Sequence, residues 1–136
     1  MVTSTLKEAL YYEELENGKV RCTLCPHRCV IENGKAGICN VRKNLDGKLY
    51  SLVYGKISAM AMDPIEKKPL FHFHPGSWIF SLSTVGCNLK CKNCQNWEIS
   101  QATIESLPLR ELTPDDVINL ALDDGSEGIA WTYNEP

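Results

Sequence analysis

The chain has 136 residues, of which 43% are hydrophobic and 23% are charged, and it carries a formal net charge of −3. This length and composition suit one ordinary soluble globular domain. The negative charge argues against a general nucleic-acid surface, which needs a clustered excess of Lys and Arg. No apolar run approaches the roughly 20 residues of a membrane span, and the N-terminus lacks the apolar core of a secretory signal. The composition therefore favours a cytoplasmic protein without nucleic-acid or membrane partners.

The N-terminal segment predicts a short helix. Residues 6–15 combine apolar residues at Leu6, Leu10 and Leu15 with interspersed charges, which is typical of an amphipathic helix. The Asn-Gly pair at 17–18 is expected to end it.

Four of the seven cysteines come next, at Cys22, Cys25, Cys29 and Cys39. A Cys-x-x-Cys turn lets two sulfurs face one metal ion, and nearby glycines let the backbone fold around it. An odd cysteine count with clustered spacings suits metal binding in a reducing compartment better than disulfides, although a disulfide-stapled loop is the alternative. Zinc and an iron–sulfur cluster would both satisfy four thiolates. His27 lies inside the set, either as a replacement ligand or as an exposed loop histidine.

The middle of the chain predicts β structure. Residues 40–54 read as a β-hairpin with Asp46-Gly47 at its turn, and the short apolar segment 57–62 allows a further strand. Residues 63–69 are polar and contain two prolines, so they form a candidate boundary between an N-terminal cap and the rest of the chain.

Two histidines, His72 and His74, alternate with Phe71 and Phe73. On an extended segment both would share one face, as metal ligands or acid–base groups would. The simpler interpretation is two polar residues on the wet face of a strand.

Three further cysteines directly follow an apolar run at 78–85 that predicts a buried strand. They are Cys87, Cys91 and Cys94. Three thiolates close in sequence can hold three irons of a cubane iron–sulfur cluster. The fourth iron then lacks a protein ligand, and an open coordination position lets a metal site bind and activate a small molecule.

The last third of the chain predicts a βαβ unit. Residues 95–102 are expected to begin a helix with Trp97 as a core contact. A second helix starts at residues 113–116, which supply a hydroxyl N-cap, a proline and two acids, and it ends at Gly125. Residues 128–133 predict the next strand, parallel to the first. Because the ends of parallel strands meet at one edge of a sheet, the cysteine loop and residues 134–136 are expected to lie together.

The spacing Cys-x-x-x-Cys-x-x-Cys after a strand resembles the signature of the radical S-adenosylmethionine (SAM) superfamily. The wider pattern resembles one branch, the AmmeMemoRadiSam-system radical SAM proteins, which are related to the pyruvate formate-lyase-activating enzymes. That pattern adds the first cysteine set, Lys67-Lys68-Pro69-Leu70, Phe71-His72-Phe73 and Thr132-Tyr133-Asn134-Glu135-Pro136. The resemblance covers nearly the whole chain from residue 20, although only the Glu-Pro part of the family's Gly-Gly-Glu-Pro-like turn matches.

The resemblance implies an α/β fold. Residues 77–136 would form the first βαβ part of a radical SAM partial (β/α) barrel, and residues 1–76 a small Cys-rich cap with a β-hairpin and a metal knuckle. A barrel of this family has about six strands, so the sequence is most simply an N-terminal fragment of a longer protein.

The resemblance also implies the cofactors and the reaction. Cys87, Cys91 and Cys94 would hold a [4Fe-4S] cluster whose open iron binds SAM. An electron from an external donor would then cleave SAM to methionine and a 5′-deoxyadenosyl radical, which abstracts hydrogen from a substrate. A protein or peptide substrate is implied by analogy with glycyl-radical activases.

The remaining site residues follow from the same resemblance. Glu135 and Asn134 are expected to contact the amino group of SAM. Asn93 stands where the superfamily commonly has an aromatic residue, and it is expected to hydrogen-bond the adenine. The first cysteine set would hold zinc or an auxiliary cluster that relays electrons.

Two other classes use the same cysteines. An electron-transfer protein with two clusters is one, although simple two-cluster ferredoxins normally supply four ligands to each cluster. The other is a zinc-stabilised interaction module in which His72 or His74 completes the site of the last three cysteines.

Overall fold

The computed structural model describes residues 6–135 as a mixed α/β chain with several small sheets and few helices. The N-terminal part holds β1 (Lys7–Glu8), β2 (Tyr12–Glu14), a 3-10 helix (Glu16–Gly18), β3 (Val20–Cys22), β4 (Val30–Ile31), β5 (Arg42–Leu45) and β6 (Lys48–Ser51). The rest holds β7 (Lys56–Ile57), β8 (Ala59–Pro64), a 3-10 helix (Ile65–Lys67), β9 (Trp78–Ser83), α1 (Trp97–Ser100), β10 (Arg110–Glu111), α2 (Pro114–Asp123) and β11 (Gly128–Trp131). The predicted α/β class is confirmed at this level.

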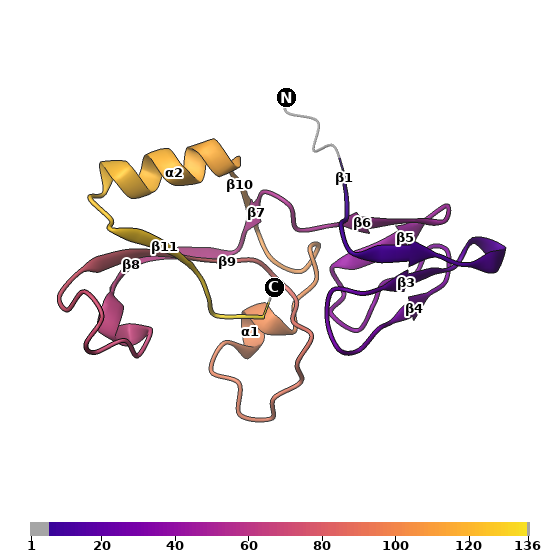
Figure 1. Cartoon of the computed structure of the whole chain (residues 1–136), viewed down its shortest axis with the longest axis horizontal. Helices are drawn as coiled ribbons and strands as arrows, with labels where there is room; N and C mark the ends of the chain where they lie inside the picture. The colour runs from indigo at the N-terminus through magenta and orange to yellow at the C-terminus, as the bar shows by residue number, and fades with distance from the viewer. Residues whose placement is uncertain (1–5, 136) are drawn as a thin grey trace.

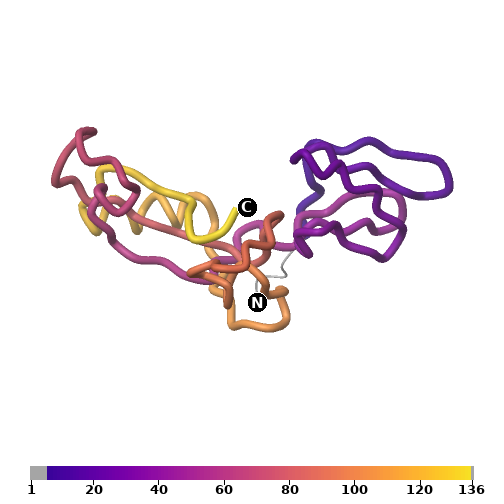
Figure 2. Tube along the Cα trace, turned by 90° about the horizontal axis from the view of Figure 1, so that it is seen from below, coloured from indigo at the N-terminus to yellow at the C-terminus, as the bar shows by residue number. Residues whose placement is uncertain are grey.

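The two parts form two lobes that lie side by side (Figures 1 and 2). The N-terminal lobe consists of two three-stranded antiparallel sheets, in the orders β1-β6-β5 and β2-β3-β4. Its core contains the buried side chains of Val20, Ile31 and Leu49. The predicted hairpin is confirmed as β5 and β6, and Asp46 and Gly47 at its turn both have positive φ, as a tight hairpin turn requires.

The predicted helix over residues 6–15 is wrong. Lys7 and Glu8 pair with β6, and Tyr12–Glu14 pair with β3, while Tyr11 between them has a φ of 60°. Pairing with strands that come later in the chain therefore overrides the helical spacing of the leucines.

The second lobe is built on a sheet in the order β11-β9-β8. β9 and β11 are parallel, with Ile79 opposite Gly128 and Leu82 opposite Trp131. Helix α2 packs on one face of this sheet, where Val117 and Ala121 contact Phe80 and Leu82 in a buried cluster (Figure 1). The predicted βαβ unit with a parallel pair is therefore confirmed.

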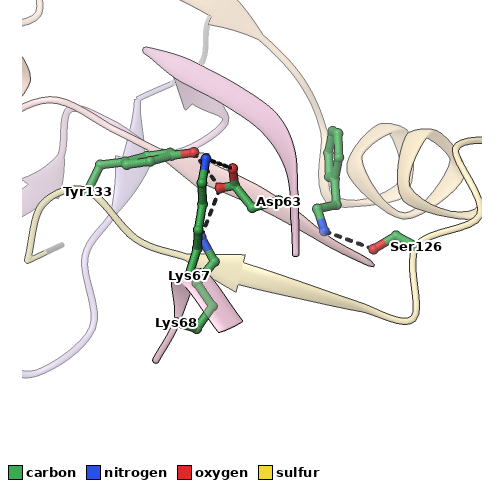
Figure 3. A network of polar contacts seen from close by, with 6 residues as sticks. Asp63, Lys67, Lys68, Ser126 and Tyr133 are labelled. Atoms are coloured by element: carbon green, nitrogen blue, oxygen red, sulfur yellow. Dashed lines mark hydrogen bonds and ion pairs between the residues drawn. The ribbon is translucent and has the colours of Figure 1, made fainter. Parts of the chain in front are cut away.

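The short connection between α2 and β11 is held in place by the side chain of Ser126. The Ser126 hydroxyl accepts a hydrogen bond from the backbone amide of Phe80 at 2.8 Å and donates to the carbonyl of Gly128 at 2.6 Å (Figure 3 shows the first bond). This hydroxyl therefore ties the turn after α2 to the central strand.

Strand β8 is antiparallel to β9 over six residues, from Ala59 opposite Ser83 to Pro64 opposite Trp78. Asp63, expected in a polar loop, is instead buried in this strand, because Lys67, Lys68 and Tyr133 from other segments donate to its carboxylate. The strand expected at 57–62 is present as β7 and β8. The predicted boundary between the cap and the barrel part, at residue 76, lies in the connection between β8 and β9, which are neighbouring strands of one sheet.

Helix α2 begins as its sequence predicts, with a capping box. Thr113 Oγ1 accepts from the amide of Asp116 at 3.1 Å, and Asp116 Oδ2 accepts from the amide of Thr113 at 2.8 Å. The segment expected to begin a helix at 95–102 contains only the single turn α1, and Trp97 is 62% exposed, so its predicted core contact is wrong.

Replacing Thr113 with alanine is expected to destabilise the chain by about 1 kcal/mol, because the hydroxyl cap is lost from a helix that packs on the main sheet. Thermal unfolding followed by circular dichroism should show a melting temperature lower by about 4 °C. Thr113→Ser keeps the hydroxyl and should melt close to the wild type. Equal melting of the alanine and serine variants would contradict a stabilising cap.

None of the helices in the described part of the chain has the length and apolar character needed to cross a bilayer.

Candidate functional site

The loops that follow the parallel strands β9 and β11 line one pocket of about 370 Å³. Cys87, Cys91 and Cys94 are in its wall, together with Asn134 and Glu135 from the turn after β11. Its other lining residues are Leu89, Asn96, Ser100, Gln101, Trp131, Thr132 and Tyr133. The cysteine loop and the turn thus meet at one edge of the sheet, as expected, whereas residue 136 lies outside the described residues.

The sulfur of Cys87 is buried and surrounded by backbone donors. Its Sγ accepts from the amides of Leu89 and Glu135, each with 3.4 Å between nitrogen and sulfur. The Sγ of Cys94 lies 3.3 Å from the hydroxyl of Ser100. Hydrogen bonds to sulfur tune the reduction potential of iron–sulfur clusters. The donor set of this pocket therefore fits a thiolate-bound cluster.

The two loops are also joined to each other by side-chain amides. Asn134 Nδ2 donates to the carbonyl of Gly86 at 2.6 Å and to Thr84 Oγ1 at 3.2 Å. Asn96 Nδ2 donates to the carbonyl of Tyr133 at 3.0 Å. Because the amide nitrogen of Asn134 is used in this way, its oxygen is the atom suited to accept from a ligand's ammonium group.

Asn93 is exposed and is not among the residues that line the pocket. Ser100 and Gln101, by contrast, line it without having been predicted from sequence. The side-chain oxygen of Gln101 accepts a hydrogen bond from Lys90 Nζ at 2.9 Å, and this bond ties the cysteine loop to the end of α1. No spacing or motif distinguishes these two residues in the sequence, because their position depends on where α1 ends.

The N-terminal lobe packs directly against the start of the cysteine loop. Gly86 has a φ of +79°, and a Cβ placed there would lie 2.4 Å from the carbonyl oxygen of Cys39 and 2.6 Å from Cγ1 of Val41. In addition, His27 Nε2 lies 2.8 Å from the carbonyl oxygen of Asn88. A carbonyl only accepts, so Nε2 carries the proton and only Nδ1 remains for a metal. His27 therefore connects the two cysteine sets.

Three members of the first cysteine set lie at or between the ends of β3 and β4, because Cys22 ends β3 and Cys29 directly precedes β4. The amide of Cys22 donates to the carbonyl of Cys29 at 2.9 Å, and the amide of Arg28 donates to that of Cys25 at 3.2 Å. A Cβ on Gly37 would lie 3.6 Å from the sulfur of Cys29, which brings the segment before Cys39 against the same hairpin.

All seven cysteines are free thiols, so no disulfide staples the N-terminal loop. Cys22 packs in the core of the N-terminal lobe, and Cys39 packs against the buried side chains of Val41 and Val85. As they stand, no three His, Cys, Asp or Glu side chains within residues 6–135 are gathered on one metal-ion position.

Beside Tyr133, in the turn after β11, lies a buried carboxylate, Asp63, which is 5% exposed (Figure 3). It accepts from Lys67 Nζ at 3.1 Å, Lys68 Nζ at 3.0 Å and Tyr133 Oη at 3.0 Å. Burial alone would raise the pKa of Asp63, but hydrogen bonding to Lys68, Ser81, Lys67 and Tyr133 outweighs it and holds the pKa well below its usual range. The Ser81 hydroxyl is buried close by without a well-aligned partner in residues 6–135. Asp63 is thus ionised at neutral pH.

His72 and His74 do not share a face of a strand. Residues 71–74 form bends, His74 has a φ of 47°, and both side chains are exposed. Neither histidine lines the pocket. The prediction of an extended segment is wrong here because β8 ends at Pro64 and β9 begins only at Trp78.

No protein-family model matches the chain, and no solved structure matches it. The chain is similar to a protein of Methanocaldococcus jannaschii described as uncharacterized protein MJ0808, with 47% identity over 131 residues. The match covers 96% of this chain and 39% of the relative, so the chain spans about two fifths of the length of the curated relative it matches.

Proposed function

We propose that the protein is a radical SAM enzyme of the AmmeMemoRadiSam branch. One observation carries the proposal. Three thiols spaced as in that superfamily line a single pocket with Asn134 and Glu135, which come from the turn after the neighbouring parallel strand. In the proposed whole protein, β9 and β11 are the first two strands of a partial (β/α) barrel, whose ligand edge is the edge where these loops meet.

Cys87, Cys91 and Cys94 would hold a [4Fe-4S] cluster, because soft thiolates select iron–sulfur clusters and three of them leave one iron open. When bound, the cluster would supply the electron that cleaves SAM to methionine and a 5′-deoxyadenosyl radical. The amides of Leu89 and Glu135 donate hydrogen bonds to the sulfur of Cys87. The burial of this cysteine, together with the loop around it, excludes water from one side of the site.

The turn after β11 would bind the amino acid end of SAM. Asn134 and Glu135 line the pocket, and their side chains carry oxygens that can accept from an ammonium group, which offers only donors. Asn93 would reach the adenine from the exposed part of the cysteine loop. We propose a protein or peptide as the substrate, together with an external electron donor.

The first cysteine set would bind zinc or an auxiliary iron–sulfur cluster through Cys22, Cys25, Cys29 and Cys39. The support is that Cys22, Cys25 and Cys29 lie on one hairpin tied by backbone hydrogen bonds, and that all four thiols are free. The contact of His27 with the carbonyl of Asn88 supports a position of this metal near the cysteine loop.

Anaerobic purification and reconstitution test the proposal. We expect about four irons and four sulfides at the pocket, with any zinc or further iron at the first cysteine set. Electron paramagnetic resonance of the reduced protein should change when SAM is added, because SAM would bind the open iron. Zinc without sulfide would contradict the enzyme and favour a zinc module. A cubane signal that SAM leaves unchanged would favour electron transfer.

A further inference from the structure

Tyr133 has an unusual backbone for its residue type. Its φ is 71°, in the left-handed region that favours glycine. It also stands directly before the two residues that line the pocket from this turn, Asn134 and Glu135. A strained conformation next to a binding pocket persists only where the surroundings hold it.

The surroundings of Tyr133 do hold it, through side chains far away in the sequence. Its hydroxyl donates to Asp63 at 3.0 Å, and Lys68 Nζ lies 5.5 Å from the centre of its ring (Figure 3). Lys68 is itself largely buried and bonded to Asp63 at 3.0 Å. The backbone carbonyl of Tyr133 accepts from Asn96. We call Asp63, Lys68 and Tyr133 the clamp.

The clamp fixes the turn on the sheet side, while the cysteine loop fixes it on the other. There Asn134 Nδ2 donates to the carbonyl of Gly86, and the amide of Glu135 donates to the sulfur of Cys87. A turn held on both sides has little freedom left to lose when a ligand binds its side chains.

We infer that Tyr133 is a positioning residue, held by Asp63 and Lys68, that pre-organises Asn134 and Glu135 for the amino acid end of SAM. This inference rests on the proposed function. It adds that the SAM affinity of the pocket depends on a buried carboxylate of β8 that does not line it.

Tyr133→Phe tests the inference, because it removes one hydroxyl and keeps the ring and the backbone. Tyr12→Phe is the matched control, since the Tyr12 hydroxyl also donates to a carboxylate, Glu8 Oε1 at 2.7 Å, but in the N-terminal lobe. In the anaerobically reconstituted chain we expect Tyr133→Phe to weaken SAM binding about tenfold in equilibrium dialysis, with unchanged iron content. Tyr12→Phe should bind SAM as the wild type does.

Hydrogen exchange of the metal-free chain gives a second measurement. Amides of residues 131–135 should exchange faster in Tyr133→Phe and at the wild-type rate in Tyr12→Phe. Asp63→Ala is a second variant that breaks the same bond, because it removes the acceptor, and the Asp63→Ala and Tyr133→Phe double variant should lose little more than Asp63→Ala alone.

The possible outcomes separate the two proposals. Wild-type SAM affinity and exchange in both Tyr133→Phe and Asp63→Ala would overturn the clamp and leave the proposed function standing. A wild-type chain that carries its cluster and binds no SAM would overturn the proposed function, and the positioning role would fall with it.

Discussion

Replacing Gly86 with alanine is expected to lower the melting temperature of the chain by about 10 °C. Two effects add. A φ of +79° costs a residue with a Cβ on the order of 1 kcal/mol, and overpacking a filled site costs about 2 kcal/mol more. The overpacking arises because the new Cβ would meet backbone, the carbonyl of Cys39 at 2.4 Å, as well as Cγ1 of Val41 at 2.6 Å.

Gly76→Ala is the matched control for this prediction. Gly76 has almost the same φ, +80°, but among residues 6–135 no atom lies within 4 Å of a Cβ placed there. This variant should show the backbone cost alone, a melting temperature lower by about 4 °C. Thermal unfolding by circular dichroism measures both. Equal shifts in melting temperature for the two variants would mean that the N-terminal lobe is not tightly packed against the cysteine loop at Gly86.

The position of Gly86 also gives the substitution a functional consequence. Its amide donates to the carbonyl of Ile99 at 3.1 Å, and its carbonyl accepts from Asn134. Any shift that makes room for a Cβ therefore moves the residue before Cys87 and the turn that carries Glu135. We expect Gly86→Ala to lose iron on reconstitution as well as stability, whereas Gly76→Ala should keep its iron.

Local patterns in the sequence were sufficient for those elements whose determinants lie within a few residues. The start of helix α2 is predicted by Thr113, Pro114 and Asp116, and Thr113 is the N-cap in the structure, as expected. The hairpin of β5 and β6 follows from its Asp-Gly turn. The leucine spacing of residues 6–15 led to a wrong prediction of a helix. The segment pairs with β6 and β3, which lie elsewhere in the chain, and its own sequence does not specify these partners.

The contacts around the pocket can also be sorted into those that local sequence patterns predict and those that they do not. The cysteine spacing and the rule for parallel strands sufficed to bring Cys87 together with Glu135, because each residue directly follows a strand that the sequence predicts. The bond between Asp63 and Tyr133 spans 70 positions, and the contact between His27 and Asn88 spans 61. Such pairs depend on how whole sheets and lobes pack, so no short motif specifies them.

Replacing Cys91 with alanine is expected to remove the SAM-responsive cluster. Iron and sulfide at the pocket should fall close to zero, since a cubane held by two thiolates lacks a further ligand. Cys91 is exposed, so the fold itself should lose no more than about 0.5 kcal/mol. Metal at the first cysteine set should remain. Metal analysis and paramagnetic resonance with and without SAM, alongside thermal unfolding, measure all three expectations.

Two control variants show which cysteines belong to which site. Lys92→Ala alters an exposed neighbour on the same loop and should keep both the cluster and its response to SAM. Cys25→Ala should have the reciprocal effect of Cys91→Ala, losing metal from the first cysteine set while the pocket still responds to SAM. Because His27 joins the two sets only through a carbonyl and not through a shared ligand, the two losses should be separable. If Cys91→Ala emptied both sites, the seven cysteines would have to be divided differently, and the open iron assigned to the pocket would no longer follow from three ligands.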